Sequence, residues 1–128
     1  MRGFTLLELI VVVTLIGLLA TLAGSNLIQQ SVEAERKIAL AKCREYYDAT
    51  WSWMLFQRAA RAPEHLSRVA APLRDGERNF VRLEQDPWGQ EFRIERETGR
   101  NFRIWSNGPD AEPGTSDDLC YEPLDERQ

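Results

Sequence analysis

The chain has 128 residues, with 16 Lys and Arg against 20 Asp and Glu, and a formal net charge of −4 at pH 7. This length fits one small domain with an additional segment. Because nucleic-acid-binding proteins concentrate Lys and Arg on one face, the acidic balance argues against DNA or RNA as a partner. Residues 9–32 contain no charged side chain, whereas charges crowd the rest of the sequence.

The apolar N-terminal segment is predicted to cross a membrane. Residues 4–28, at about 1.5 Å per helical residue, can span a hydrocarbon core of about 30 Å. Arg2 is the only charge ahead of this segment, so the positive-inside rule keeps Met1 in the cytoplasm. A secretory signal carries a small-residue cleavage site after its apolar run. The candidate site here is Ala20-Thr21-Leu22-Ala23-Gly24, but bulky Leu22 interrupts it and the apolar run resumes at Leu27, so we expect a retained anchor.

Glu8 places a carboxylate inside this apolar segment. Insertion scales give a cost of about 2.5–3.5 kcal/mol for comparable charges, and an intramembrane acid therefore indicates function. In the alternative interpretation, Glu8 lies near the interface and reaches water, or is protonated. The position of Gly3 directly before Phe4, with Glu8 four residues beyond Phe4, favours the functional interpretation.

The prepilin signal shared by type IV pilins and type II secretion pseudopilins resembles the run Gly3-Phe4-Thr5-Leu6-Leu7-Glu8-Leu9-Ile10-Val11-Val12. The resemblance implies that an inner-membrane prepilin peptidase cuts between Gly3 and Phe4 and methylates the new amino terminus at Phe4. Residues 1–3 are then a leader peptide, residues 4–28 a transmembrane and filament-core helix, and residues 29–128 a periplasmic head that includes the amphipathic half of the helix.

Cleavage would also provide a partner for Glu8. The Phe4 amine of one subunit carries a positive charge that Glu8 of a neighbour can neutralise within a bundle of apolar helices. A buried ion pair needs both members, because a single uncompensated charge costs several kcal/mol. Glu8 is therefore the predicted assembly residue.

The helix is predicted to continue beyond the membrane as an amphipathic segment. Its apolar residues recur at steps of about three, four and seven: Leu27, Val32, Ala39, Cys43, Tyr46, Tyr47, Thr50 and Met54. Aromatic side chains at this spacing indicate a packed core. The family commonly has a proline near the junction of the two halves, where this chain has Ser25.

A short second helix is predicted over residues 61–70, with Pro63 in its first turn. Pro72 and Asp75-Gly76 are expected to end it. His65 is the only histidine and has no second His or Cys at ligand spacing, so we interpret it as a surface residue. The sequence lacks the residue combinations that support nucleophilic catalysis.

A β-hairpin is predicted after the turn Asp86-Pro87-Trp88-Gly89. Phe92 and Ile94 alternate with charged residues, as do Phe102 and Ile104, which is typical of a sheet with one buried face. The order of this turn, the hairpin and the loop that begins at Ser106 resembles the carboxy-terminal half of the major pseudopilin of type II secretion. The resemblance covers residues 3 to about 30 and 86 to about 119.

The loop after the hairpin is acidic. From Ser106 onward there are seven acidic residues and one basic residue, a density that requires solvation or neutralisation. The major pseudopilins hold Ca²⁺ in this loop, and the matching side-chain ligands are Asp110, Asp117 and Asp118, with carbonyls of Asn107 and of a residue near Thr115 or Ser116. Asn107 replaces the usual leucine of the family. A solvated acidic turn without calcium is the alternative.

Cys43 and Cys120 leave two possibilities open. A disulfide between them would tie the C-terminal region to the helix and contribute about 2–4 kcal/mol. Two unpaired buried thiols are the other possibility, because free cysteine packs like a small hydrophobic residue.

Together these features predict an α+β protein with a long helix, a short helix, a small antiparallel sheet and a C-terminal calcium loop. The resemblance implies a structural, non-enzymatic subunit of the type II secretion pseudopilus, which polymerises with copies of itself and other pseudopilins. Its further partners are the prepilin peptidase, the inner-membrane assembly platform and the secretin; ATP hydrolysis belongs to another protein, since the chain has no phosphate-binding Gly-rich loop. Alternatives are a type IV pilin or minor pseudopilin acting in adhesion, motility or DNA uptake, and a membrane-anchored periplasmic enzyme or binding module.

Overall fold

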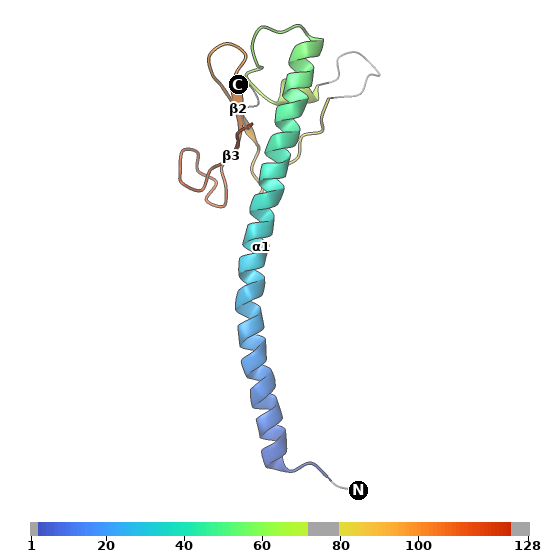
Figure 1. The fold of residues 1–128 in the computed structure, drawn as a ribbon, viewed down its shortest axis with the longest axis vertical. Helices are drawn as coiled ribbons and strands as arrows, with labels where there is room; N and C mark the ends of the chain where they lie inside the picture. Colours follow the sequence, from blue (N-terminus) through green and yellow to red (C-terminus); the bar gives the residue numbers. More distant parts are fainter. Residues whose placement is uncertain (1–2, 72–79, 124–128) are drawn as a thin grey trace. The chain divides into compact units, whose positions relative to one another are not determined.

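The computed structural model describes residues 3–71 and 80–123, except the side chains of Ser25 and Asn26 (Figure 1). It divides into two compact units, residues 1–34 and 35–128. The predicted end of the second helix at Pro72 and Asp75-Gly76 lies outside the described residues, as do Met1 and Arg2.

One helix, α1 (Leu6–Phe56), runs for 51 residues. Thr5 caps its N-terminus: the Thr5 hydroxyl oxygen accepts a hydrogen bond from the backbone N–H of Glu8 at 3.2 Å, and the Thr5 carbonyl accepts one from Leu9 at 3.1 Å. Thr-x-x-Glu is the sequence of a capping box, and an acidic residue in the first turn is favourable next to the positive end of the helix dipole. The prediction of a single long helix is confirmed.

The N-terminal part of α1 presents its apolar side chains outward. Leu6, Leu9, Ile16 and their neighbours are more than 40% exposed. The hydroxyls of Thr14 and Thr21 each donate to the carbonyl one turn earlier, at 2.7 Å, and so need no partner outside the helix. Within the described residues, α1 is the one helix that is long and apolar enough to span a membrane.

The C-terminal part of α1 forms one side of the core of the second unit. Its buried residues follow helical spacing, with at most 1% of each exposed: Ala39, Cys43, Tyr46, Thr50 and Met54. These were predicted as the inward face, and the structure confirms them. Leu27 and Val32, which the same periodicity predicts to be inward, are 65% and 45% exposed. They belong to the first unit, in which none of the described residues joins a hydrophobic core.

The second helix is shorter than predicted. α2 comprises Ser67–Ala70, and the chain from residue 59 to 66 is irregular although Ala62 and Leu66 are buried. The helical conformation is disfavoured for a residue that precedes a proline, so Ala62 cannot easily join a helix with Pro63. The prediction that the helix starts at residue 61 is therefore wrong, whereas His65 is exposed as expected.

A three-stranded antiparallel sheet with the order β1-β2-β3 completes the second unit. β1 (Arg93–Arg96) and β2 (Phe102–Ser106) form the predicted hairpin, with Ile94 opposite Ile104. β3 (Leu119–Tyr121), which we did not predict, pairs with β2 and places Cys120 opposite Trp105. Phe102 and Ile104 are 4% and 0% exposed, as the alternation indicates.

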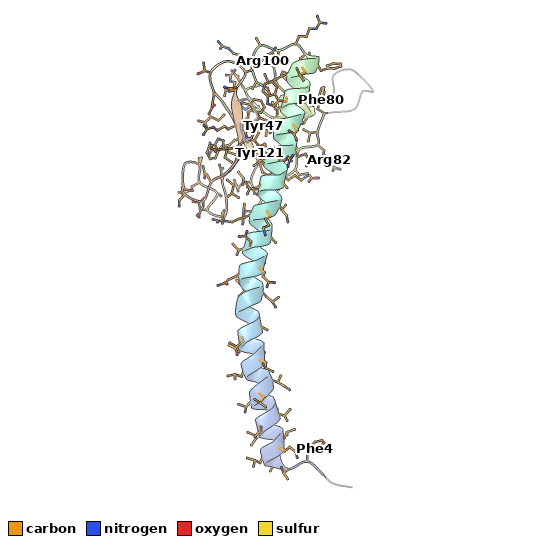
Figure 2. The ribbon with its side chains drawn as sticks, in the orientation of Figure 1. Phe4, Tyr47, Phe80, Arg82, Arg100 and Tyr121 are labelled. Atoms are coloured by element: carbon orange, nitrogen blue, oxygen red, sulfur yellow. The ribbon has the colours of Figure 1, made fainter. Side chains whose placement is uncertain are left out.

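Aromatic rings join the sheet to α1. Tyr47 stacks on Phe102 of β2 with centroids 4.7 Å apart and meets Tyr121 of β3 edge to face at 5.5 Å. Figure 2 labels Tyr47 on α1 and Tyr121 beside it. Tyr46 makes a T-shaped contact with Phe92 at 5.0 Å. The predicted aromatic core is therefore present and fixes the sheet against the helix.

Candidate assembly and ion-binding sites

The residues of the predicted processing site lie together before and within the first turn of α1. Gly3 and Phe4 are exposed in non-helical chain, and Phe4 is 86% exposed (Figure 2). Glu8 is exposed too, and among the residues that the structure describes its carboxylate has no ion pair. A peptidase could therefore reach the Gly3–Phe4 bond, and Glu8 is available to a cation from another molecule.

The loop between β2 and β3 contains the predicted calcium ligands. Asp118 closes it with a side chain that is 6% exposed. Its Oδ2 accepts a hydrogen bond from Arg93 Nη2 at 2.6 Å and one from the backbone N–H of Gly114 at 2.8 Å, while Oδ1 accepts one from the Thr115 hydroxyl at 3.3 Å. Burial by itself raises the pKa of Asp118, but these donors and the Arg93 charge outweigh it and lower that pKa below its usual value.

The other predicted ligands have different partners. Asn107 Oδ1 accepts a hydrogen bond from Arg93 Nε at 2.8 Å. Asp117 Oδ1 lies 3.9 Å from Arg36 Nη2, and Asp110 Oδ1 accepts from the backbone N–H of Glu112 at 3.1 Å. Ser116 is exposed and has no partner described here.

The oxygen atoms of these predicted ligands, as they are arranged, do not fit a calcium site. Ca²⁺ requires 6–8 oxygen ligands, several of them carboxylates that converge on one point. Within residues 3–71 and 80–123, no three acidic, His or Cys side chains gather closely enough to hold a metal ion. The oxygens of Asp118 are already bonded to three donors, one of them a guanidinium. Calcium binding stays a prediction.

The turn that precedes β1 is tied to this loop by a buried carboxylate that sequence reasoning did not identify as important. Asp86 is 5% exposed; its Oδ1 accepts the backbone N–H groups of Trp88 at 3.1 Å and Gln90 at 2.8 Å. Its Oδ2 accepts the Ser106 hydroxyl at 2.7 Å, and Ser106 Oγ in turn accepts the N–H of Gly108 at 3.2 Å. The sequence does offer a signal for this role: an aspartate at the start of a turn commonly accepts, through its side chain, the backbone N–H two residues further on.

Gly108 brings the two ends of the loop together. It has a φ of +71°, a conformation that glycine adopts without strain. A Cβ at this position would overlap the backbone carbonyl of Asp117. The close approach of residues 108 and 117 therefore depends on the absence of a side chain.

Both cysteines are free thiols in the structure. Cys43 is fully buried, with its Sγ 4.0 Å from the carbonyl oxygen of Leu119, and Cys120 is partly buried on β3. Burial raises the pKa of Cys43 to about 12 and that of Cys120 to about 11. The arrangement matches the alternative of two unpaired thiols, and the disulfide stays a prediction.

The N-terminal sequence matches a known family model. Residues 1–24 match the prokaryotic N-terminal methylation motif. Together with the apolar part of α1, this match fits a membrane-anchored protein.

The whole chain is similar to one group of secretion proteins. Type II secretion system core protein G from Pectobacterium carotovorum is 34% identical over 137 residues, covering 98% of this chain and 87% of that protein. The core protein G of Escherichia coli K12 is 33% identical, covering 92% and 88%. Among solved structures, the major pseudopilin from the type 2 secretion system of enterohaemorrhagic Escherichia coli has a TM-score of 0.59 and 26% identity, covering 74% of this chain and 92% of that one.

These relatives agree with the fold and with the N-terminal motif. A long N-terminal helix and a small head with an antiparallel sheet are found here as in the pseudopilin structure. The chain belongs to the type II secretion system core protein G family and is a structural subunit of the pseudopilus.

Proposed function

We propose that this subunit polymerises through the apolar part of α1 and acts mechanically, without catalysis of its own, to help move folded proteins across the outer membrane. Before assembly it is a single-pass protein of the inner membrane with its N-terminus in the cytoplasm and its head in the periplasm. After assembly the head forms the outer surface of a periplasmic filament.

The single observation that carries this proposal is Glu8. Within residues 3–71 and 80–123 this acid in the first turn of α1 has no ion pair, and the side chains around it are apolar and exposed. Leu6, Leu7 and Leu9 are between 57% and 79% exposed, a surface that requires lipid or other helices. In a bundle of such helices an unpaired carboxylate is costly, so a cation from a neighbouring copy is needed.

The methylation motif supports the identity of that cation. Cleavage after Gly3 by a prepilin peptidase creates an amine at Phe4, four residues before Glu8. Methylation of this amine keeps its positive charge at neutral pH. We infer that Glu8 of one subunit pairs with the Phe4 amine of another, and that the pair sets the register between subunits.

Membership in the type II secretion family supports our proposal for the remaining partners. The subunit is extracted from the membrane by an inner-membrane assembly platform, joins other pseudopilins, and grows toward the secretin in the outer membrane. The energy comes from a separate ATPase, since the chain has no phosphate-binding motif of its own.

Replacing Glu8 tests the proposal. Glu8→Ala and Glu8→Gln should each reduce filaments, seen by electron microscopy of sheared cells, at least about tenfold, because both leave the neighbour's amine unpaired. Glu91→Ala removes an exposed carboxylate from the head and serves as the matched control. Tryptophan fluorescence should show an unchanged head in all three variants. Normal filaments from Glu8→Ala would contradict the proposal.

A further inference from the structure

The acidic loop between β2 and β3 is bridged by a cation that belongs to the chain itself. Arg93 on β1 donates from Nε to Asn107, where the loop begins, and from Nη2 to Asp118, where it ends. The two bonds, at 2.8 and 2.6 Å, use two nitrogens of one rigid guanidinium group. One side chain thus joins both ends of the loop.

The position of Arg93 is fixed by the sheet. Arg93 lies opposite Trp105 in the β1–β2 register, and its guanidinium carbon is 5.4 Å from the centre of the Trp105 ring. A cation over an aromatic face at this distance is attracted to it. The side chain is therefore held by three contacts before any ion from solution is considered, and its carboxylate partner is almost fully buried.

Asp118 is also one of the side chains that the resemblance assigns to calcium, whereas Asn107 is assigned there through its backbone carbonyl and meets Arg93 through its side-chain oxygen. A guanidinium and a divalent cation compete for the same carboxylate, because two positive charges a few ångströms apart repel. The neighbouring acid, Asp117, also has an arginine within reach, Arg36, in a more exposed and looser pair at 3.9 Å. The two adjacent acids at the end of the loop thus each face an arginine.

We propose that Arg93 is the cation that closes this loop in place of a metal ion, so that the head of this subunit folds and keeps its loop ordered without calcium. The inference concerns the head alone and does not depend on how the subunits assemble. It predicts that the stability of the head depends on Arg93 and is independent of divalent cations.

The test uses the full chain in detergent micelles. Its four tryptophans all lie in residues 35–128, so the thermal midpoint (Tm) of tryptophan fluorescence reports on the head. The wild-type Tm should differ by less than about 1 °C between excess EGTA and excess CaCl₂, because a ligand raises Tm only if it binds the folded state. Calorimetric titration of the wild-type chain with CaCl₂ should give no saturable binding heat.

Variants of Arg93 supply the second arm. Arg93→Met removes both bonds while keeping an unbranched apolar side chain, and should lower Tm by about 5–10 °C in EGTA. Arg93→Lys keeps the positive charge but not the planar guanidinium group, and its Tm should lie between those of the wild type and Arg93→Met. The matched control is Arg96→Met, on the same strand, whose 2.7 Å pair with Glu64 is exposed on both sides; it should shift Tm by less than about 3 °C.

Two results would overturn the proposal. One is a rise of about 4 °C or more in the wild-type Tm when CaCl₂ replaces EGTA, since a metal would then close the loop. The other is an Arg93→Met variant that melts like Arg96→Met. If Arg93→Met does not fold at all, the wild-type comparison and the calorimetry still decide the question.

Discussion

Asp86 offers a sharp test of how the head is held together, because its buried carboxylate accepts three hydrogen bonds from two separate segments. Replacing it by alanine removes the acceptor for Trp88, Gln90 and Ser106. The first two N–H groups belong to partly buried residues that water can approach, whereas Ser106 is 0% exposed and keeps an unsatisfied hydroxyl. An unsatisfied buried group costs about 1–3 kcal/mol, and each lost bond to a charged acceptor adds to this.

Removing the carboxylate also removes the cost of taking its charge out of water, which offsets part of this loss. We therefore expect Asp86→Ala to lower the free energy of unfolding of the head by about 3 kcal/mol. Asp86→Asn keeps the acceptor for the two turn N–H groups but presents an amide to Ser106, whose hydroxyl proton then has no acceptor. We expect a loss of about 1–2 kcal/mol for this variant. For a head of residues 35–128, each kcal/mol corresponds to about 4–8 °C in Tm.

The assay is the tryptophan-fluorescence melt of the full chain in detergent, with Asp48→Ala as control, since Asp48 is an exposed acid on α1. The control should stay within about 0.5 kcal/mol of the wild type. The order of Tm should be wild type, Asp86→Asn, Asp86→Ala. If Asp86→Ala melts with the control, the three bonds do not contribute to stability and the reasoning is refuted.

Two further predictions follow from the loop and the thiols. Because the folded-state pKa of Asp118 is lowered, its contribution to stability is complete above its unfolded pKa of about 3.9 and is lost as the pH falls through the lower folded value; the wild-type Tm should therefore fall more steeply below about pH 4 than that of Asp118→Asn, and parallel curves would contradict this. With pKa values of about 12 for Cys43 and about 11 for Cys120, both thiols are protonated at neutral pH. Alkylation without reductant should add two groups to the denatured chain, and in the folded chain Cys120 should react before Cys43; a denatured chain that takes up none would establish the disulfide instead.

Local periodicity predicted the parts of the fold whose determinants are close in sequence. The inward face of α1 was predicted because Ala39, Cys43 and Tyr46 repeat at the helical period, and each of them is buried. The hairpin was predicted because Ile94 and Ile104 alternate with charges on either side of a short turn. The start of α2 was predicted wrongly. The prediction placed Pro63 inside the helix, whereas in the structure Pro63 lies in irregular chain before the helix.

The features that were missed depend on partners far away in the chain. Arg93 lies in an alternating strand, where a charged residue indicates a solvated face, and only the return of the chain at β3 brings Asp118 to it, 25 residues later. Asp86 belongs to a recognisable turn, but its bond to Ser106 connects residues 20 apart. The loop carboxylates were therefore predicted as a group, whereas their partners required the three-dimensional structure.

The most direct test of the assembly mechanism is the mass of the subunit recovered from sheared filaments, with its N-terminal fragment sequenced by mass spectrometry. We expect a chain that lacks residues 1–3 and begins at N-methylated Phe4. A chain that keeps Met1 and is found only as a monomer in detergent extracts would contradict both the processing at Gly3 and the pairing of Glu8 with a neighbouring subunit.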